Sequence, residues 1–182
     1  MRTLVMIAAL LVTAHARLAA QPPLIGDAGD GGIQVRLHSE RSEYRIGELM
    51  TISVLSERSA YLLLYYVDAS GQAQLIVPSS YSTHDRVYPA QSLQVRDNRG
   101  RLLQQRGPRG TEWMQAVVTR EPLDLEPFAA YLTPDSEAPL IRDPQGFTAA
   151  VQQELARRLA ERKDPKVPVF GVAVLQYRVE EP

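Results

Sequence analysis

The residue types best suited to chemistry lie together in one polar stretch, Ser79–Pro89 (SSYSTHDRVYP). It contains the components of a serine-hydrolase triad: Ser79, Ser80, Ser82, His84 and Asp85. A working triad needs the histidine between nucleophile and carboxylate in space, which residues this close along one loop rarely achieve. The chain also has no G-x-S-x-G motif, the turn that exposes the serine of α/β-hydrolases. We therefore expect a polar loop, and keep a small periplasmic hydrolase using Ser, His and Asp from loops as an alternative function.

Metal chemistry has few candidate ligands in this sequence. The chain has 3 histidines and no cysteine, and only His38 and His84 lie beyond the first 16 residues. A zinc site usually needs three or four protein ligands from His, Cys and carboxylates. Asp27 and Asp30 lie among glycines, but they lack the alternating ligands and the distal Glu of a calcium-binding loop. We therefore expect no metal and no cofactor.

Aromatic and basic side chains in two predicted loops are better suited to binding than to catalysis. Tyr and Arg are enriched where proteins contact partners. The first loop is 79–89 and the second is 100–110. The candidate binding residues in these loops are Tyr81, His84, Tyr88, Arg106 and Arg109.

The N-terminal 16 residues are typical of a secretory signal peptide. Arg2 precedes the uncharged apolar run Leu4–Val12, and Ala14 and Ala16 have the spacing that signal peptidase requires. Cleavage after Ala20 is the alternative. The apolar run is much shorter than the roughly 20 residues of a membrane-spanning helix, so we expect no membrane span. Without cysteine there is no acylation site for a bacterial lipid anchor. The sequence thus predicts a soluble periplasmic or extracellular protein.

The composition of the chain beyond the signal peptide limits the class of partner. Removing Arg2 leaves 19 basic residues against 21 acidic ones, so there is no basic excess to attract nucleic acid. The remaining chain is large enough to form a core without disulfides. We expect a flexible lead-in over residues 17–32, rich in Pro, Gly and Asp, and a single domain over 33–182.

Apolar patterning predicts that this domain is mainly β. Apolar and polar residues alternate at 33–37 and 50–54, as in strands with one buried face. Residues 60–67 are almost all apolar, as in a central strand covered on both faces, with Tyr65 and Tyr66 on opposite faces. The Asp68–Gly71 turn leads to a returning strand at 72–77, and further strands are expected at 91–96, 111–119 and 167–179. On the last strand Ala173, Leu175, Tyr177 and Val179 share one face.

One helix is predicted, over about 144–162. Asp143 is suited to cap it and Pro144 to occupy its first position. Phe147, Val151, Leu155 and Leu159 recur every four residues, which indicates a helix face that packs against the core. Basic residues at its end, Arg157–Arg158 and Arg162–Lys163, are expected to be solvated.

The motifs of the first half of the domain resemble a bacterial envelope family, the domain of unknown function 4384. The residues that carry the resemblance are Tyr44-x-x-Gly47-Glu48, Ile52-x-Val54-x-Ser56, Ala60-Tyr61-Leu62, Val67-Asp68-x-x-Gly71, Ile76-x-Pro78 and Gly110-x-Glu112 through Ala116 to Thr119. Their structural explanations are turns at Gly47 and Gly71, a core position for Tyr61, and a strand end at Pro78. The resemblance covers roughly residues 33–122.

This resemblance implies an antiparallel, immunoglobulin-like β-sandwich, here with one C-terminal α-helix covering a sheet edge or face. Similar domains occur as lone exported proteins or beside peptidase-like, kinase or envelope-anchoring modules, and the resemblance transfers no catalytic residues. We therefore expect a non-enzymatic cell-envelope interaction domain whose partner is an envelope protein or a cell-wall component. A structural or stress-protective envelope factor is the other alternative.

Overall fold

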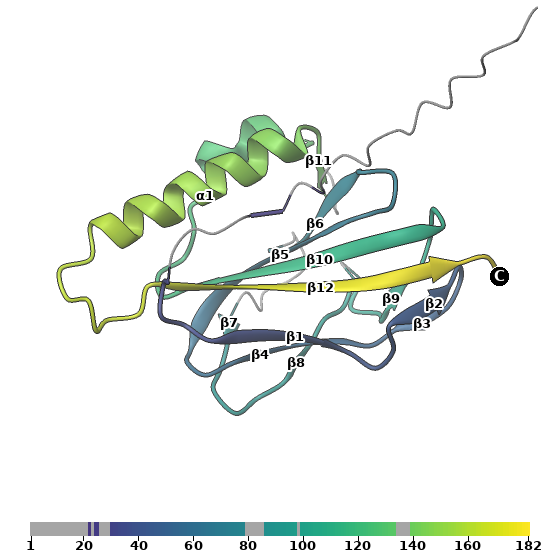
Figure 1. Ribbon diagram of the computed structural model, residues 1–182, viewed down its shortest axis with the longest axis horizontal. Coiled ribbons are helices and arrows are strands. Elements are labelled where there is room, and N and C mark those ends of the chain that lie inside the picture. Colours follow the sequence, from purple (N-terminus) through teal and green to yellow (C-terminus); the bar gives the residue numbers. More distant parts are fainter. Residues whose placement is uncertain (1–21, 23, 26–29, 79–85, 98, 134–138) are drawn as a thin grey trace, which may run out of the picture.

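The computed structural model describes residues 22, 24–25, 30–78, 86–97, 99–133 and 139–182. Its largest feature is a main sheet with the strand order β11-β6-β5-β10-β12-β2, and β7 also pairs with β5 (Figure 1). The bounds of these strands are β2 Glu43–Arg45, β5 Ala60–Val67, β6 Ala73–Val77, β7 Arg86–Val87, β10 Gly110–Thr119, β11 Leu140–Ile141 and β12 Phe170–Glu180. All neighbours pair antiparallel except β12 and β2, which are parallel.

A second sheet packs on one face of the main sheet, so the fold is the expected mainly antiparallel sandwich. It has the order β1-β4-β8, formed by Val35–Ser39, Ile52–Ser56 and Leu93–Gln94. A short pair, β3 (Leu49–Met50) with β9 (Leu103–Gln104), lies near the C-terminal end of β12 (Figure 1). The sandwich is not a closed barrel.

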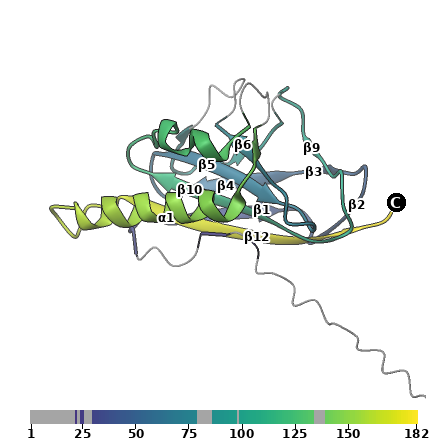
Figure 2. The same ribbon diagram turned by 90° about the horizontal axis from the view of Figure 1, so that it is seen from above.

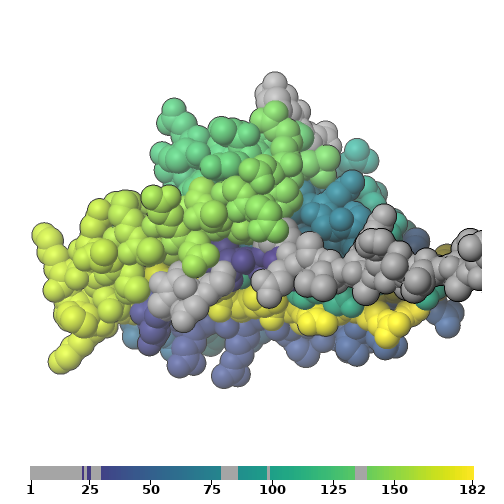
Figure 3. All heavy atoms as spheres, turned by 45° about the horizontal axis from the view of Figure 1, so that its top comes forward, coloured from purple at the N-terminus to yellow at the C-terminus, as the bar shows by residue number. Residues whose placement is uncertain are grey.

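Helix α1 (Pro144–Ala160) and the 3-10 helix η1 (Glu126–Tyr131) cover the other face of the main sheet. Seen from above, α1 lies alongside β12 over part of its length (Figure 2), and the space-filling view shows the helices on this face with β12 emerging beyond them (Figure 3). The helix therefore covers a sheet face, not an edge, and the molecule has three layers. It ends at Ala160, two residues before the predicted limit of 162.

The alternation along β5 explains why the main sheet has a core on each side. Ala60, Leu62 and Leu64 face the second sheet, in what we call the sandwich core, together with Met114 and Val118 of β10. Leu63, Tyr65 and Val67 of β5 face the helices, in what we call the helix core, together with Val117 of β10 and Phe147 of α1. The prediction of a central strand covered on both faces is confirmed.

The helix begins and packs as its sequence predicts. The side chain of Asp143 accepts a hydrogen bond from the Gly146 amide at 2.9 Å, and Pro144 follows it. Phe147, Val151 and Leu155 are fully buried in the helix core. The helix end is less solvated than expected, because Arg158 donates to the carbonyl oxygens of Glu121 and Pro122 at 2.9 and 3.0 Å.

Two positions differ from their expected environments. Tyr61, expected in the core, is only partly buried, because its place on β5 puts its ring at the sheet margin beneath the Arg86 guanidinium, 4.8 Å from the ring centroid. Ile25, within the segment expected to be a flexible lead-in, is 4% exposed and packs in the helix core. Buried Gln115 accepts from the Ile25 amide at 2.7 Å and donates to its carbonyl at 3.0 Å, which fastens this part of the lead-in.

Candidate functional site

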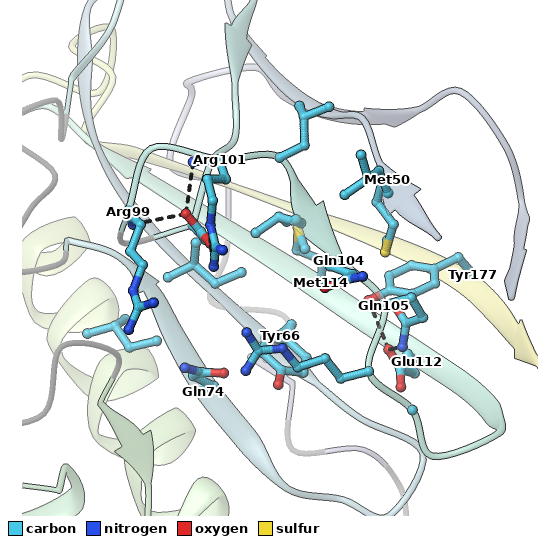
Figure 4. Close-up of a pocket in the computed structure, with 18 residues that line it drawn as sticks. Met50, Tyr66, Gln74, Arg99, Arg101, Gln104, Gln105, Glu112, Met114 and Tyr177 are labelled. Carbon is cyan, nitrogen blue, oxygen red and sulfur yellow. Dashed lines mark hydrogen bonds and ion pairs between the residues drawn. The ribbon is translucent and has the colours of Figure 1, made fainter. Parts of the chain in front are cut away.

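A pocket of about 350 Å³ lies at the β9 end of the sandwich (Figure 4). Its floor is the sandwich-facing side of β6, β5, β10 and β12, and its wall is formed by Asp97 and residues 99–107, which we call the wall segment, together with β3. The residues that line it are Leu49, Met50, Tyr66, Gln74, Leu75, Ile76, Asp97, Arg99, Arg101, Leu102, Leu103, Gln104, Gln105, Arg106, Gly107, Glu112, Met114 and Tyr177. This volume falls in the range of small-molecule sites.

The strand register assembles the floor of the pocket from three strands that are distant in sequence. Met114 lies opposite Tyr66 of β5, and Glu112 lies opposite Tyr177 of β12. Since the side chains of a strand alternate between faces, Glu112 and Met114 point the same way, toward the wall segment. The floor therefore places a carboxyl and two phenols among apolar side chains.

A tight turn shapes the outer part of the wall. The Asp97 carboxylate accepts the backbone N–H groups of Arg99 and Arg101 at 2.9 and 2.8 Å and forms an ion pair with the Arg101 guanidinium at 2.8 Å. The Gly100 amide donates to the Asp97 carbonyl, and Gly100 has a φ of +73°, which a glycine adopts without steric cost. Burial raises the pKa of Asp97, but the combined hydrogen bonds and charge of Arg101 and Arg99 outweigh it and lower the pKa overall. The carboxylate is therefore committed to the turn.

Backbone pairing holds the inner part of the wall against β3. The Gln105 amide donates to the Glu48 carbonyl at 2.9 Å, and the Gly47 amide donates to the Gln105 carbonyl at 2.8 Å. The side chain of Gln104 adds a bond to the Gly47 carbonyl at 3.0 Å. Gly47 has a φ of +93°, so its predicted role in a turn is confirmed.

A buried carboxyl joins this wall to the floor. Glu112 is 1% exposed, and its Oε2 accepts from Gln105 Nε2 at 2.9 Å and from the Tyr177 hydroxyl at 3.0 Å. Burial raises the pKa of Glu112, and the negative charge of Asp68 raises it further. The bonds from Gln105 and Tyr177 and the nearby Ala69 backbone amide act in the opposite direction. Within the described part of the chain, Glu112 Oε1 is buried with no hydrogen-bond partner.

Arg106 supplies an uncompensated positive charge at this pocket. Its side chain is exposed, and among the described residues it forms no ion pair. Burial is the main cause that raises the pKa of the neighbouring Tyr66, Glu112 and Asp68 raise it further, and the charge of Arg106 lowers it. The charge of Arg106 thus acts on the Tyr66 hydroxyl, and both side chains line the pocket.

The predicted binding residues do not form one site. Arg106 lines the pocket, whereas Arg109 lies outside it and forms an ion pair with Glu181 at 3.3 Å. Tyr88 is 45% exposed and lies beside Arg86, next to the β7 strand. Because β7 pairs with the Ala60 end of β5, Tyr88 is at the opposite end of that strand from the pocket (Figure 1). Tyr81 and His84 lie outside the described residues, as do the serines and Asp85 of the possible triad.

Several pocket residues were missed as site candidates by the sequence analysis. The available signal was a charged side chain, Glu112, at an inward position two residues before Met114 in an otherwise apolar strand. Buried charged residues are uncommon unless they are bonded, so such a position indicates a polar partner within the fold. Tyr177 was expected to share one face of its strand with Ala173, Leu175 and Val179, but its partner could not be identified from local sequence.

Metal sites and membrane helices were also sought in the described segments. They contain no group of three or more His, Asp or Glu residues arranged to hold a metal ion. Within the same segments there is no helix with the length and apolarity needed to cross a membrane.

Comparison with known proteins identifies one family. The family described as Domain of unknown function (DUF4384) has a model that matches residues 43–122, which confirms the resemblance found in the sequence motifs. The matched segment runs from β2 to just beyond β10, so it contains the wall of the pocket and the β5, β6 and β10 parts of its floor, while Tyr177 lies outside it. No curated protein and no solved structure matches this chain.

Proposed function

We propose that this protein, a chain carrying a DUF4384 domain at residues 43–122, is a non-enzymatic binding module of the cell envelope. Its signal-peptide-like N-terminus, Met1–Ala16, supports export to the periplasm or beyond. Its partner is an envelope protein or a cell-wall component, one part of which enters the pocket between β3, the wall segment and the main sheet.

The pocket is the observation that carries this proposal. Its walls are held by backbone pairing with β3 and by the Glu112–Gln105 bond, so it is formed before a ligand arrives. A preformed site has fewer groups to order when a ligand binds, so the entropy cost of ordering reduces its affinity less. Its polar groups are guanidinium, amide and phenol groups, which recognise charged or hydrogen-bonding parts of a partner.

The proposal is tested by capturing partners from the native cell envelope with the tagged exported protein, using cross-linking and mass spectrometry. The pocket is obstructed by Leu102→Trp, since Leu102 lines it. The matched control is Leu55→Trp, because Leu55 lies on β4, outside the pocket, and is 40% exposed. Circular dichroism first establishes that both variants are folded.

We expect one partner to be captured in stoichiometric amount by the wild type and by Leu55→Trp, and to be lost with Leu102→Trp. Equal capture by the two variants would refute the pocket as the binding site. Tyr88→Ala adds a second arm, because Tyr88 is exposed at the far end of β5. Loss of capture with Tyr88→Ala alone would place the interface there instead. Fractionation of cells should recover the protein outside the cytoplasm, and cytoplasmic recovery would contradict export.

A further inference from the structure

The pocket has a distinctive combination of charge and apolar surface. We infer that it binds a small amphiphilic anion, namely a carboxylate or phosphate monoester attached to an aliphatic chain or ring. This inference rests on the proposed binding function and specifies the chemistry of the group that enters the site. The anionic group could belong to a free metabolite or to the exposed end of a larger envelope component.

The charge balance of the lining favours an anion. Three guanidinium groups, those of Arg99, Arg101 and Arg106, line the pocket, against two carboxyl groups, those of Asp97 and Glu112. Asp97 is bonded to Arg101 and to the backbone of its own turn, so it does not neutralise Arg106. Glu112 is buried, and its carboxyl group is bonded to Gln105 and Tyr177 and not to Arg106. Within the described lining Arg106 is therefore left without a carboxylate partner, which favours an anionic group on the ligand.

Arg106 is the side chain best placed to bind the anionic group. It is exposed and has no ion pair within the described segments, and its planar fork of N–H donors matches two oxygens of a carboxylate or phosphate. The Tyr66 hydroxyl, close enough for its pKa to respond to the Arg106 charge, adds one further donor. Both side chains belong to the pocket lining, where they offer an anionic ligand a guanidinium group and a hydroxyl donor.

The remainder of the lining suits an apolar body. Met50, Ile76, Leu103 and Met114 contribute hydrocarbon and thioether surface, and methionine side chains adapt to ligands of different shape. In the close-up view Arg99 and Arg101 lie on one side of the pocket, while Met50 and Tyr177 lie on the other (Figure 4). The apolar body of a ligand whose anionic group lies at Arg106 would contact this hydrocarbon and thioether surface.

The test measures binding of four probes that share an eight-carbon chain, by isothermal titration calorimetry below their micelle-forming concentrations. Octanoate and octyl phosphate carry the anion, octyl glucoside is neutral, and octylammonium is positive. We expect both anions to bind at least about tenfold more tightly than the other two probes, and acetate, which has no apolar body, to bind at least about tenfold more weakly than octanoate. Added salt should weaken binding of the anions, since a partly exposed charge pair is screened.

Arg106→Gln and Arg109→Gln form the matched pair of variants. Both arginines are exposed and lie three residues apart, but only Arg106 lines the pocket. Arg106→Gln should weaken octanoate binding about tenfold to a hundredfold, because it removes a charge-assisted hydrogen bond. Arg109→Gln should leave the affinity unchanged. Leu102→Trp should abolish binding of both anions.

Two results would overturn the inference: equal affinity for octanoate and octyl glucoside, or equal effects of Arg106→Gln and Arg109→Gln. Preference for octanoate over octyl phosphate, or the reverse, distinguishes the two kinds of head group within the inferred class. The test of the anion inference can fail independently of the test of the proposed function. Envelope capture that depends on Leu102 without any preference for anions would refute this inference alone, whereas capture that ignores Leu102→Trp would refute the proposed function.

Discussion

Glu112 links the wall of the pocket to its floor through one carboxyl group. Because the pKa of this group is raised on folding, the folded state binds a proton more tightly than the unfolded state. The stability it contributes is complete below its ordinary pKa of 4.5 and is lost as the pH rises through its raised value. Ionisation of the buried Glu112 at higher pH should therefore also weaken the attachment of the wall to the floor.

Glu112→Gln should remove this pH dependence. A glutamine can still accept the bonds from Gln105 and Tyr177, but it cannot ionise. The free energy of unfolding of the variant, relative to that of the wild type, should therefore increase as the pH rises above 4.5. Urea unfolding at a series of pH values measures the difference. Tyr177→Phe is the companion variant. It removes a hydrogen bond that lowers the pKa of Glu112, so the loss of stability caused by ionisation of Glu112 should move to higher pH. Parallel profiles for wild type and Glu112→Gln would contradict the assignment.

Two tyrosines of β5 provide a direct test of side-chain orientation. Tyr65 is fully buried against Phe147, with ring centroids 5.7 Å apart, and donates to Gln115. Tyr61 is partly exposed beneath Arg86. Tyr65→Ala should therefore destabilise the protein by about 3–5 kcal/mol in urea melts, as large-to-small core changes do. Tyr61→Ala should reduce the free energy of unfolding by less than half of that amount. Equal losses for the two variants would contradict the burial of Tyr65 and the partial exposure of Tyr61.

Helix α1 depends on its N-terminal cap and on one ion-pair cluster. Glu154 bonds to Arg157 and Arg158 at 2.7 Å, and the hydrogen bond from Arg157 is the largest cause that lowers its pKa to about 2. Arg158 in turn reaches the 121–122 backbone after β10. The helix is thus attached to the main sheet by polar bonds as well as by its buried face.

Asp143→Ala should reduce the stability of the protein by about 1 kcal/mol, because the Gly146 amide would lose its acceptor. The matched control is Gln153→Ala, an exposed position within the helix, which should change stability by no more than about 0.5 kcal/mol. Thermal melts followed by far-UV circular dichroism measure both. If the two variants melt together, the cap does not stabilise this helix.

Strands β5 and β10 contribute side chains to both the sandwich core and the helix core, and so connect all three layers. Leu63 and Leu64 are adjacent on β5, yet Leu63 lies in the helix core and Leu64 in the sandwich core. If β5 or β10 unfolded from one core, its apolar side chains in the other core would be exposed as well. We therefore expect the three layers to unfold together.

Leu63→Ala and Leu64→Ala should each destabilise by about 2–5 kcal/mol and should shift one common transition. Trp113 fluorescence and far-UV circular dichroism provide independent probes, since Trp113 reports from β10 and the dichroism reports from all layers. Coincident curves are expected for the wild type and both variants. A separate early transition in Leu63→Ala alone would mean that the helix layer unfolds independently.

The strands and the helix were predictable because their patterns are local. The nearly continuous apolar run at 60–67 predicts a strand covered on both faces, and the Asp143–Pro144 pair marks the start of α1, with no knowledge of distant residues. The same local motifs were sufficient to indicate the DUF4384 resemblance. The helix was expected to cover a sheet edge or face, and three-dimensional packing alone selected the face.

The pocket could not be predicted from these patterns, because it depends on which strands become neighbours. Glu112 meets Tyr177 only through the pairing of β10 with β12, across 65 residues of chain. Arg106 and Arg109 look alike in sequence, yet only Arg106 lines the pocket and Arg109 pairs with Glu181. Local chemistry specifies the faces of each element, whereas the site arises from long-range pairings that are formed when the whole chain packs.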